Sequence, residues 1–146
     1  MTPNITKMEE PAICAVEAGA DGIAAINTVK SLMNVDLHSF ESSPNVAGKS
    51  CVGGYSGKAV KPIALRFIHD MKKNERLKDI PISGMGGIET LDDVFEFFAA
   101  GAEAVQIGTA NFTHPETAEK LVKELEEFIT NNGFNDLNEL KRELRA

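Results

Sequence analysis

The sequence has no Trp, one Tyr and only two Cys, and aromatic residues make up 6% of its 146 positions. Cys14 and Cys51 are too few for a disulfide scaffold and show no CxxC or Cys/His spacing typical of a metal site. The first ten residues contain no basic segment followed by an apolar run, so no signal peptide is expected. These absences favour a reduced, cytoplasmic protein without a metal centre.

Basic residues are also scarce, because 15 Lys and Arg stand against 22 Asp and Glu, giving a formal net charge of -7. Such a balance argues against a broad nucleic-acid or membrane surface, although backbone N–H groups alone can bind a phosphate. With 42% hydrophobic residues, the chain has material for one core, and we expect a single domain over residues 1–146. A complete βα-barrel would need about 250 residues.

Amphipathic helices alternate with short apolar strands, which predicts an α/β fold with parallel strands and right-handed crossovers. Thr6 and Glu9 have the spacing of a capping box before the first helix, whereas Pro11 favours a later start. Thr90 and Asp136 are the expected caps of two later helices. The expected strands are 23–26, 80–83 and 104–107, and the expected helices are 6–18, 58–71, 90–101, 115–131 and 136–144.

Two further features concern the connections between these elements. Gly19-Ala20-Asp21 and Gly101-Ala102-Glu103 lead into the first and third strands in the same way, which indicates a reused βα unit. Residues 29–57 contain many turn residues, and we expect them to form one long loop. Because long loops inside compact domains are usually functional or mobile, this segment is a candidate lid or binding loop.

Three glycine clusters each follow a strand or begin a helix. Glycine lets backbone N–H groups approach a phosphate closely, and the following helix N-terminus adds a partial positive charge. A tight turn explains any single cluster better, but three converging clusters favour a phosphate site. The spacings match neither a P-loop nor a dinucleotide fingerprint. The clusters are Gly57, Gly86 with Gly87, and Gly108 with Thr109.

Asn27 and Thr28 follow the first strand, at the edge where barrel enzymes place their functional groups. An Asn side chain offers a donor and an acceptor, which suits the ring amide or imide of a heterocycle. A strand-end cap that bonds its own backbone is an equally good interpretation, and both stay open. Lys58 and Lys61 could face a phosphate, although solvated lysines are the more common case. No Ser/His pair or carboxylate dyad is recognisable.

Several segments, in this order, resemble the C-terminal half of the FMN-dependent dihydroorotate and dihydropyrimidine dehydrogenase family. The resemblance extends over essentially the whole chain and implies the C-terminal half of a TIM (β/α)8 barrel, with strands 6 to 8 and the tail of strand 5. It also implies FMN as the cofactor and a pyrimidine as the small-molecule substrate. The segments are TPNIT (2–6), GADG (19–22), INT (26–28), GGYSGKAVKPIALR (53–66), PISGMGGI (81–88) and VQIGTA (105–110).

The resemblance also assigns roles to individual residues. Two branches of the family compete, because TPNITKMEEPA is closer to the dihydropyrimidine branch and GMGGIETLDDV is closer to the NAD-linked dihydroorotate branch. The implied reaction is hydride transfer between FMN and C6 of a 5,6-dihydropyrimidine, while a base handles the C5 proton. The family's FMN-phosphate contacts fall on Gly57, Gly86, Gly87, Gly108 and Thr109, its backbone contact to the flavin on Ile26, and its pyrimidine contacts on Asn27 and Thr28.

The departures from the family concern its N-terminal half. A flavin-binding Lys and the Cys or Ser base belong there, so no catalytic residue is assigned here and the isolated chain is expected to be inactive. Cys51 lies on a different segment and is not that base. An open half-barrel leaves exposed edges, so we expect a homo-oligomer or a complementing N-terminal half. The alternative is a non-catalytic phosphate- or flavin-binding half-barrel that self-associates.

Overall fold

The computed structural model describes residues 1–145. The helices in this range are α1 (Glu9–Glu17), α2 (Lys61–Lys73), α3 (Leu91–Ala99), α4 (Ala110–Thr113), α5 (Thr117–Asn131) and α6 (Leu137–Leu144), and a 3-10 turn, η1 (Lys58–Val60), precedes α2. The strands are β1 (Ile23–Ala25), β2 (Val29–Ser31), β3 (Asn34–Val35), β4 (Ser42–Ser43), β5 (Asn45–Val46), β6 (Lys49–Ser50), β7 (Gly53–Tyr55), β8 (Ile82–Met85) and β9 (Ala104–Gln106).

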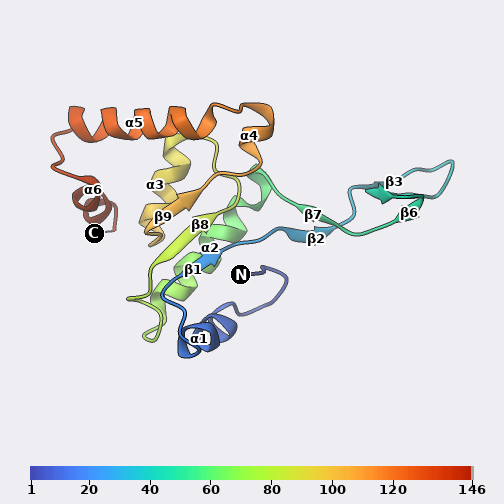
Figure 1. Ribbon diagram of the computed structural model, residues 1–146, viewed down its shortest axis with the longest axis horizontal. Helices are drawn as coiled ribbons and strands as arrows, with labels where there is room; N and C mark the ends of the chain where they lie inside the picture. Colours follow the sequence, from blue (N-terminus) through green and yellow to red (C-terminus); the bar gives the residue numbers. More distant parts are fainter. Residues whose placement is uncertain (146) are drawn as a thin grey trace.

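The central sheet has the order β1-β8-β9, and both strand pairs are parallel (Figure 1). Ile23 pairs with Ile82 in one ladder, and Met85 pairs with Gln106 in the other. The predicted α/β class with a parallel sheet is therefore confirmed. Within residues 1–145 the three-stranded sheet stays open and does not close into a barrel. It is consistent with part of a TIM-type barrel.

One face of this sheet packs against helices, and the other is uncovered. α2 contacts β1 and β8, and α3 contacts β9. Side chains alternate along the strands, so that Ile23 and Ile82 are buried while Ala24 and Gln106 are exposed. A sheet covered on both faces would bury both sets of side chains. The uncovered face is the one that the interior of a barrel would present.

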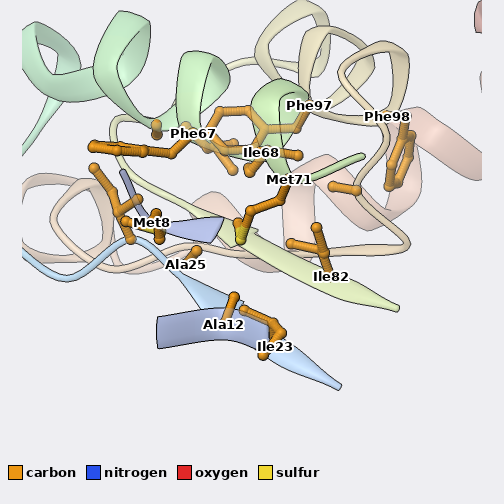
Figure 2. Packing of buried hydrophobic residues seen from close by; sticks show 14 of the residues in the cluster. Met8, Ala12, Ile23, Ala25, Phe67, Ile68, Met71, Ile82, Phe97 and Phe98 are labelled. Atoms are coloured by element: carbon orange, nitrogen blue, oxygen red, sulfur yellow. The ribbon is translucent and has the colours of Figure 1, made fainter. Parts of the chain in front are cut away.

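The core lies between this sheet and the helices, as Figure 2 shows. α2 contributes Phe67, Ile68 and Met71, which are at most 1% exposed. α1 adds Ala12, and Met8 lies directly before this helix; both side chains are fully buried. Burial of each large side chain contributes roughly 1.5–3 kcal/mol. The amphipathic pattern of 58–71 therefore predicted the central helix of the core, which the structure divides into η1 and α2.

The helix caps agree with the sequence at two positions and differ at one. Thr90 and Asp93 form a reciprocal capping box, and Asp136 Oδ1 accepts a hydrogen bond from Glu139 N at 2.8 Å. The Thr6–Glu9 box was wrong, because α1 begins at Glu9 and has no side-chain cap. Pro11 then occupies the third helical position, where its missing N–H costs no intrahelical hydrogen bond.

The two Gly-Ala joints have the same hydrogen-bond pattern. The N–H of Gly19 and that of Gly101 each bond the carbonyl three residues earlier, at 2.9 and 3.0 Å. The N–H of Ala20 and that of Ala102 each bond the carbonyl five residues earlier, at 3.0 and 2.9 Å. Both glycines have a positive φ, which this helix-ending motif requires. The repeated βα unit inferred from the sequence is therefore visible in the backbone.

All three strand predictions need correction at their ends, and the first strand ends at Ala25 rather than residue 26. The second parallel strand begins at Ile82 rather than residue 80 and runs to Met85. Pro81 has no N–H to donate to the ladder, and its carbonyl oxygen accepts the N–H of Ile23 at 2.9 Å just before the ladder begins. The third strand ends at Gln106 rather than residue 107. The helix predicted over 115–131 begins at Thr117, after the short and unpredicted α4.

Residues 29–55, which we call the arm, are not the long irregular loop that the sequence predicted. β2 pairs with β7, β3 with β4, and β5 with β6, all antiparallel. The arm extends away from the parallel sheet, as Figure 1 shows. Its strands are only two or three residues long, so no alternation of apolar and polar residues could mark them. Among residues 1–145, no helix is long and apolar enough to cross a membrane.

Candidate functional site

A cavity of about 380 Å³ lies at the carboxyl ends of β1, β8 and β9. In parallel α/β folds this end of the sheet is where ligands bind. The eight residues predicted to bind cofactor or substrate all line it, so the structure brings that set together. Their roles stay predictions. The set comprises Ile26, Asn27, Thr28, Gly57, Gly86, Gly87, Gly108 and Thr109.

The segment after β1 is fixed from two sides. Ile26 is 3% exposed, and its N–H donates to the Met85 carbonyl oxygen at 3.1 Å. The N–H of Asn27 donates to the carbonyl oxygen of Met1 at 2.8 Å. These two bonds hold the chain between β8 and the first residues at the point where it leaves the sheet. Asn27 and Thr28 are exposed and line the cavity.

The Asn27 side chain makes a local bond and also keeps a free group. Its Oδ1 accepts the N–H of Thr28 at 2.7 Å, as the strand-end cap interpretation expected. Its Nδ2 has no hydrogen-bond acceptor in the part of the chain that the structure describes, so the amide can still donate. The two interpretations left open by the sequence are therefore compatible with each other.

The glycine segments approach each other closely around Gly87. Gly87 has φ +78°, and a Cβ built there would lie 2.7 Å from the Gly57 carbonyl oxygen and 3.0 Å from Lys58 Cα. A side chain at Gly87 would therefore separate the two segments. The N–H groups of Gly87, Gly108 and Thr109 donate to no acceptor within residues 1–145. Such free donors beside the start of a helix fit the oxygens of a phosphate.

Two polar side chains of the cavity were missed by sequence reasoning. Ser56 Oγ accepts a hydrogen bond from Thr109 Oγ1 at 3.0 Å, which joins the end of the arm to the segment after β9. Gln106 Nε2 donates to Ser83 Oγ at 2.8 Å on the uncovered face of the sheet. Ser56 directly precedes a glycine of the predicted site, and Gln106 is a polar residue within an apolar strand. Both signals were present in the sequence.

Lys61 does not face the cavity, which corrects one possibility raised from the sequence. Its Nζ lies 2.6 Å from Asp93 Oδ1 and 2.7 Å from Glu96 Oε2. The hydrogen bonds that Lys61 donates to the carboxylates of Asp93 and, second, Glu96 raise its pKa. Lys58 is exposed and does not line the cavity either. Backbone donors, rather than these lysines, are therefore available to a phosphate.

Asp93 links the starts of two helices behind the glycine segments. Its side chain is 5% exposed, and its Oδ2 accepts the N–H groups of Glu89 and Thr90, both at 2.9 Å. Burial opposes ionisation, but the bonds from Lys61 and these N–H groups lower the pKa of Asp93 to about 2. The ion pair thus fixes α2 relative to α3, and with them the segments that carry Gly57 and Gly87.

The remaining reactive side chains lie elsewhere. Cys51 is on the arm, where its Sγ donates to the Pro44 carbonyl oxygen at 3.3 Å. His38, His69 and His114 do not line the cavity. Over residues 1–145, no group of three or more His, Cys, Asp or Glu residues is arranged to hold a metal ion. The chemistry available at the cavity is therefore hydrogen bonding from amides and hydroxyls.

Fold and site together define a parallel α/β protein with a glycine-lined cavity at the carboxyl ends of its strands. A family model described as dihydroorotate dehydrogenase matches residues 1–129. The chain therefore belongs to the dihydroorotate dehydrogenase family. This confirms the resemblance found in the sequence motifs.

Curated relatives come from both branches. The NAD-dependent dihydropyrimidine dehydrogenase subunit PreA of Escherichia coli (strain K12) is 50% identical over 141 residues, which cover 96% of this chain and 34% of that protein. The catalytic subunit of dihydroorotate dehydrogenase B (NAD(+)) of Caldicellulosiruptor saccharolyticus is 44% identical over 140 residues, covering 96% and 44%. Its counterpart in Listeria innocua serovar 6a is 43% identical over 144 residues, covering 99% and 45%. The chain thus spans less than half of the length of these relatives.

Proposed function

We propose that this chain is the FMN-phosphate and pyrimidine-binding part of a pyrimidine oxidoreductase of the dihydroorotate or dihydropyrimidine dehydrogenase type. The observation that carries the proposal is the convergence of all predicted contact residues on one cavity. Family membership and the names of the relatives support the same activity class.

The phosphate of FMN would bind to the N–H groups around Gly57, Gly86, Gly87, Gly108 and Thr109. Two observations support this fit. The N–H groups of Gly87, Gly108 and Thr109 are free within residues 1–145. A Cβ added at Gly108 would meet no atom within 4 Å, so the approach to these donors is open. Ile26, fixed by its bond to Met85, would contact the flavin through its backbone.

Asn27 and Thr28 would orient the pyrimidine ring. The Oδ1 of Asn27 is used by Thr28 N–H, so the side chain offers its NH2 group to a ring carbonyl. Bound FMN would supply the hydride chemistry at C6 of the dihydropyrimidine. The protein's own task at this cavity is to hold the ring and the cofactor in fixed relative positions.

Turnover would require a base, and the side chains that line the cavity offer none that is free. The side chains that line it include no His, Lys, Asp, Glu or Cys, and the hydroxyl of its serine, Ser56, already accepts a hydrogen bond from Thr109. We therefore propose that the 146 residues alone do not turn over a dihydropyrimidine. A complementing segment would have to bring the base.

The open sheet supports a partner or a second copy. Gln106 and Ala24 are exposed on the uncovered face, and β9 has only β8 as a neighbour within residues 1–145. An apolar cavity of about 210 Å³ between α3, β9 and α5 leaves Val122 56% exposed. Unpaired strand edges favour further pairing. The second candidate function is thus a non-catalytic flavin-binding half-barrel that self-associates.

Flavin titration tests the binding proposal. We expect the purified chain to quench FMN fluorescence and Gly108→Glu to weaken binding at least about tenfold, because a carboxylate would compete with the phosphate. Asn138→Glu adds the same charge on the exposed face of α6 and is the matched control. Circular dichroism checks that both variants fold. Absence of FMN binding by the unsubstituted chain would disprove the proposal for these 146 residues.

Turnover and mass measurements separate the two candidates. Anaerobic addition of dihydroorotate or dihydrouracil to the FMN-loaded chain should leave the flavin absorbance unchanged. Sedimentation should show a dimer if the open edges pair with each other, and a compact monomer would count against self-association. Reduction of the flavin by either substrate would contradict the proposal that the base is supplied from outside these residues.

A further inference from the structure

The backbone between the cavity and the arm passes through residues 27–30. β1 ends at Ala25 and β2 begins at Val29. Asn27 and Thr28 therefore lie between the parallel sheet and the arm, and Val29 and Lys30 begin the β2–β7 ladder. The segment carries the two residues proposed to hold the pyrimidine ring. Whatever fixes its backbone therefore also fixes the geometry of ring binding.

Asn4 makes two backbone hydrogen bonds to this segment through one side chain. Its Nδ2 donates to the Thr28 carbonyl oxygen at 3.1 Å, and its Oδ1 accepts the N–H of Lys30 at 2.7 Å. A neighbouring parallel strand would satisfy the same two groups, an acceptor and a donor two residues apart. The Asn4 carboxamide therefore acts in place of a strand at this position.

The orientation of Asn4 is itself fixed. Thr2 Oγ1 accepts hydrogen bonds from Asn4 Nδ2 at 2.9 Å and from Asn4 N at 3.3 Å. Lys30 N–H can only donate to an oxygen, so the carboxamide atom that faces Lys30 is Oδ1. The atom that faces the Thr28 carbonyl is therefore the NH2 group. One rotamer of Asn4 thus fits its three side-chain contacts, with Thr2, Thr28 and Lys30.

The backbone of Gly54 packs directly against the side chain of Thr28. A Cβ built on Gly54 would lie 2.7 Å from Thr28 Cβ and 3.2 Å from Thr28 Cγ2. Only a residue without a side chain lets β7 pass this close to Thr28. Thr28 is therefore held by Asn4 at its backbone and by the Gly54 backbone at its side chain.

We propose that Asn4 and Gly54 are positioning residues for the Asn27–Thr28 pair. The connection to Asn27 is direct, because Thr28 N–H donates to Asn27 Oδ1 at 2.7 Å. When Asn4 holds the Thr28 peptide, that bond fixes the Asn27 carboxamide and leaves its NH2 group free to donate. The link to pyrimidine binding rests on the proposed function, whereas the positioning itself can be measured without any ligand.

Amide exchange and nitrogen-15 spectra of the complete 146-residue chain test the positioning. In Asn4→Leu we expect the Lys30 amide to exchange on the order of tenfold faster, because it loses its acceptor. The Thr28 amide and the Asn27 side-chain NH2 resonances should shift, although neither residue is substituted. Amides of β8 should keep their exchange rates, which shows that the fold is retained.

Two further variants distinguish the contributions of the Asn4 oxygen, the Asn4 NH2 group and the Gly54 backbone. Asn4→Asp keeps an acceptor for Lys30 N–H, so Lys30 protection should be retained while the Thr28 resonances still shift. Gly54→Ala should move the Thr28 side-chain resonances and leave the Lys30 exchange rate within about twofold. Asn135→Leu removes an exposed Asn whose Nδ2 bonds Glu139 and is the matched control, with no expected change at residues 27–30.

Ligand titrations then connect the positioning to the proposed function. Asn4→Leu should weaken orotate binding to the FMN-loaded chain about fivefold or more and leave FMN affinity within about twofold. Unchanged Lys30 exchange together with unchanged Asn27 resonances would overturn the positioning role. If the unsubstituted chain bound neither FMN nor orotate, the proposed function would fail, and the ligand-free spectra would still decide the role of Asn4.

Discussion

The body of the protein, residues 1–28 and 56–145, and the arm differ in where their apolar side chains lie. Every buried apolar residue belongs to the body, with Phe67, Leu77 and Phe97 at most 1% exposed. The arm exposes most of its large apolar side chains, with Met33 82% and Leu37 79% exposed. Backbone ladders hold the arm, whereas side-chain burial holds the body.

Stability and ligand binding therefore depend on different parts of the molecule. Burial of apolar area is the main stabilising contribution to a fold, while exposed ladders open at low free-energy cost. The cavity lies at the junction of the two regions, because Thr28 and Ser56, which line it, directly flank the arm in the sequence. Substitutions in the body should therefore change stability, and those at the junction should change binding.

The largest contrast is expected between two leucines. Leu77→Ala removes a side chain that is 1% exposed and should lower the free energy of unfolding by about 3 kcal/mol. Leu37→Ala removes a side chain that is 79% exposed and should change it by less than about 0.5 kcal/mol. Urea unfolding followed by circular dichroism measures both. Equal losses would refute the division between body and arm.

The next effect concerns the ion pair of Asp93. Its folded-state pKa of about 2 lies below the usual 3.8, so the folded protein binds fewer protons than the unfolded chain between these values. The contribution is complete above pH 3.8, is lost as the pH falls through about 2, and amounts to about 2 kcal/mol. Asp93→Asn should therefore destabilise the protein at pH 7 and show a flatter acid dependence.

Urea unfolding of both proteins from pH 7 to about pH 2 checks this expectation. Asp92→Asn is the matched control, because Asp92 neighbours Asp93 in α3 and is exposed. Parallel pH profiles for the unsubstituted protein and Asp93→Asn would show that the pair with Lys61 does not stabilise the fold.

The parts of the structure that could be predicted from the sequence are those that local residue patterns specify. The helix over α2 and the three parallel strands were predictable, because apolar periodicity and strand-ending residues are local patterns. Eight of the residues that line the cavity were also predictable, because glycines and Asn27 matched family motifs near the strand ends. Their convergence needed only the rule that parallel strands share one carboxyl edge.

The arm and the polar contacts behind the cavity were not predictable in the same way. Two-residue strands such as β3 and β5 have no periodicity to detect, and their pairing depends on where the chain turns back. The pairing of Lys61 with Asp93 joins residues 32 positions apart, and no spacing rule relates two separate helices. The role of Asn4 likewise depends on a contact with Lys30 across 26 positions.

A smaller effect is expected at the hydroxyl pair between the arm and the segment after β9. Ser56→Ala removes the acceptor of Thr109 Oγ1 and should cost about 1 kcal/mol or less in stability, since both groups are exposed. FMN affinity should fall severalfold, because Thr109 lines the proposed phosphate site. Ser39→Ala, within the arm, is the control and should leave FMN binding unchanged. Fluorescence titration distinguishes the two variants.

The smallest change in body stability is expected from the largest change in sequence, a shortened arm. Residues 32–52 would be replaced by Asn-Gly, which suits a two-residue turn because Ser31 and Gly53 already pair across the β2–β7 ladder. No buried core side chain is removed, and a shorter connection costs less closure entropy. The free energy of unfolding should stay within about 1 kcal/mol and FMN affinity within about twofold.

Adding Leu77→Ala to the shortened chain should reproduce its loss of about 3 kcal/mol, since well-separated sites contribute additively. A loss above about 2 kcal/mol from shortening alone would mean that the arm supports the sheet through its attachment at Thr28 and Ser56. Exchange of the Lys30 amide distinguishes that case. If Asn4 holds residues 27–30 as proposed, Lys30 stays protected without the outer arm, because its acceptor lies in the body.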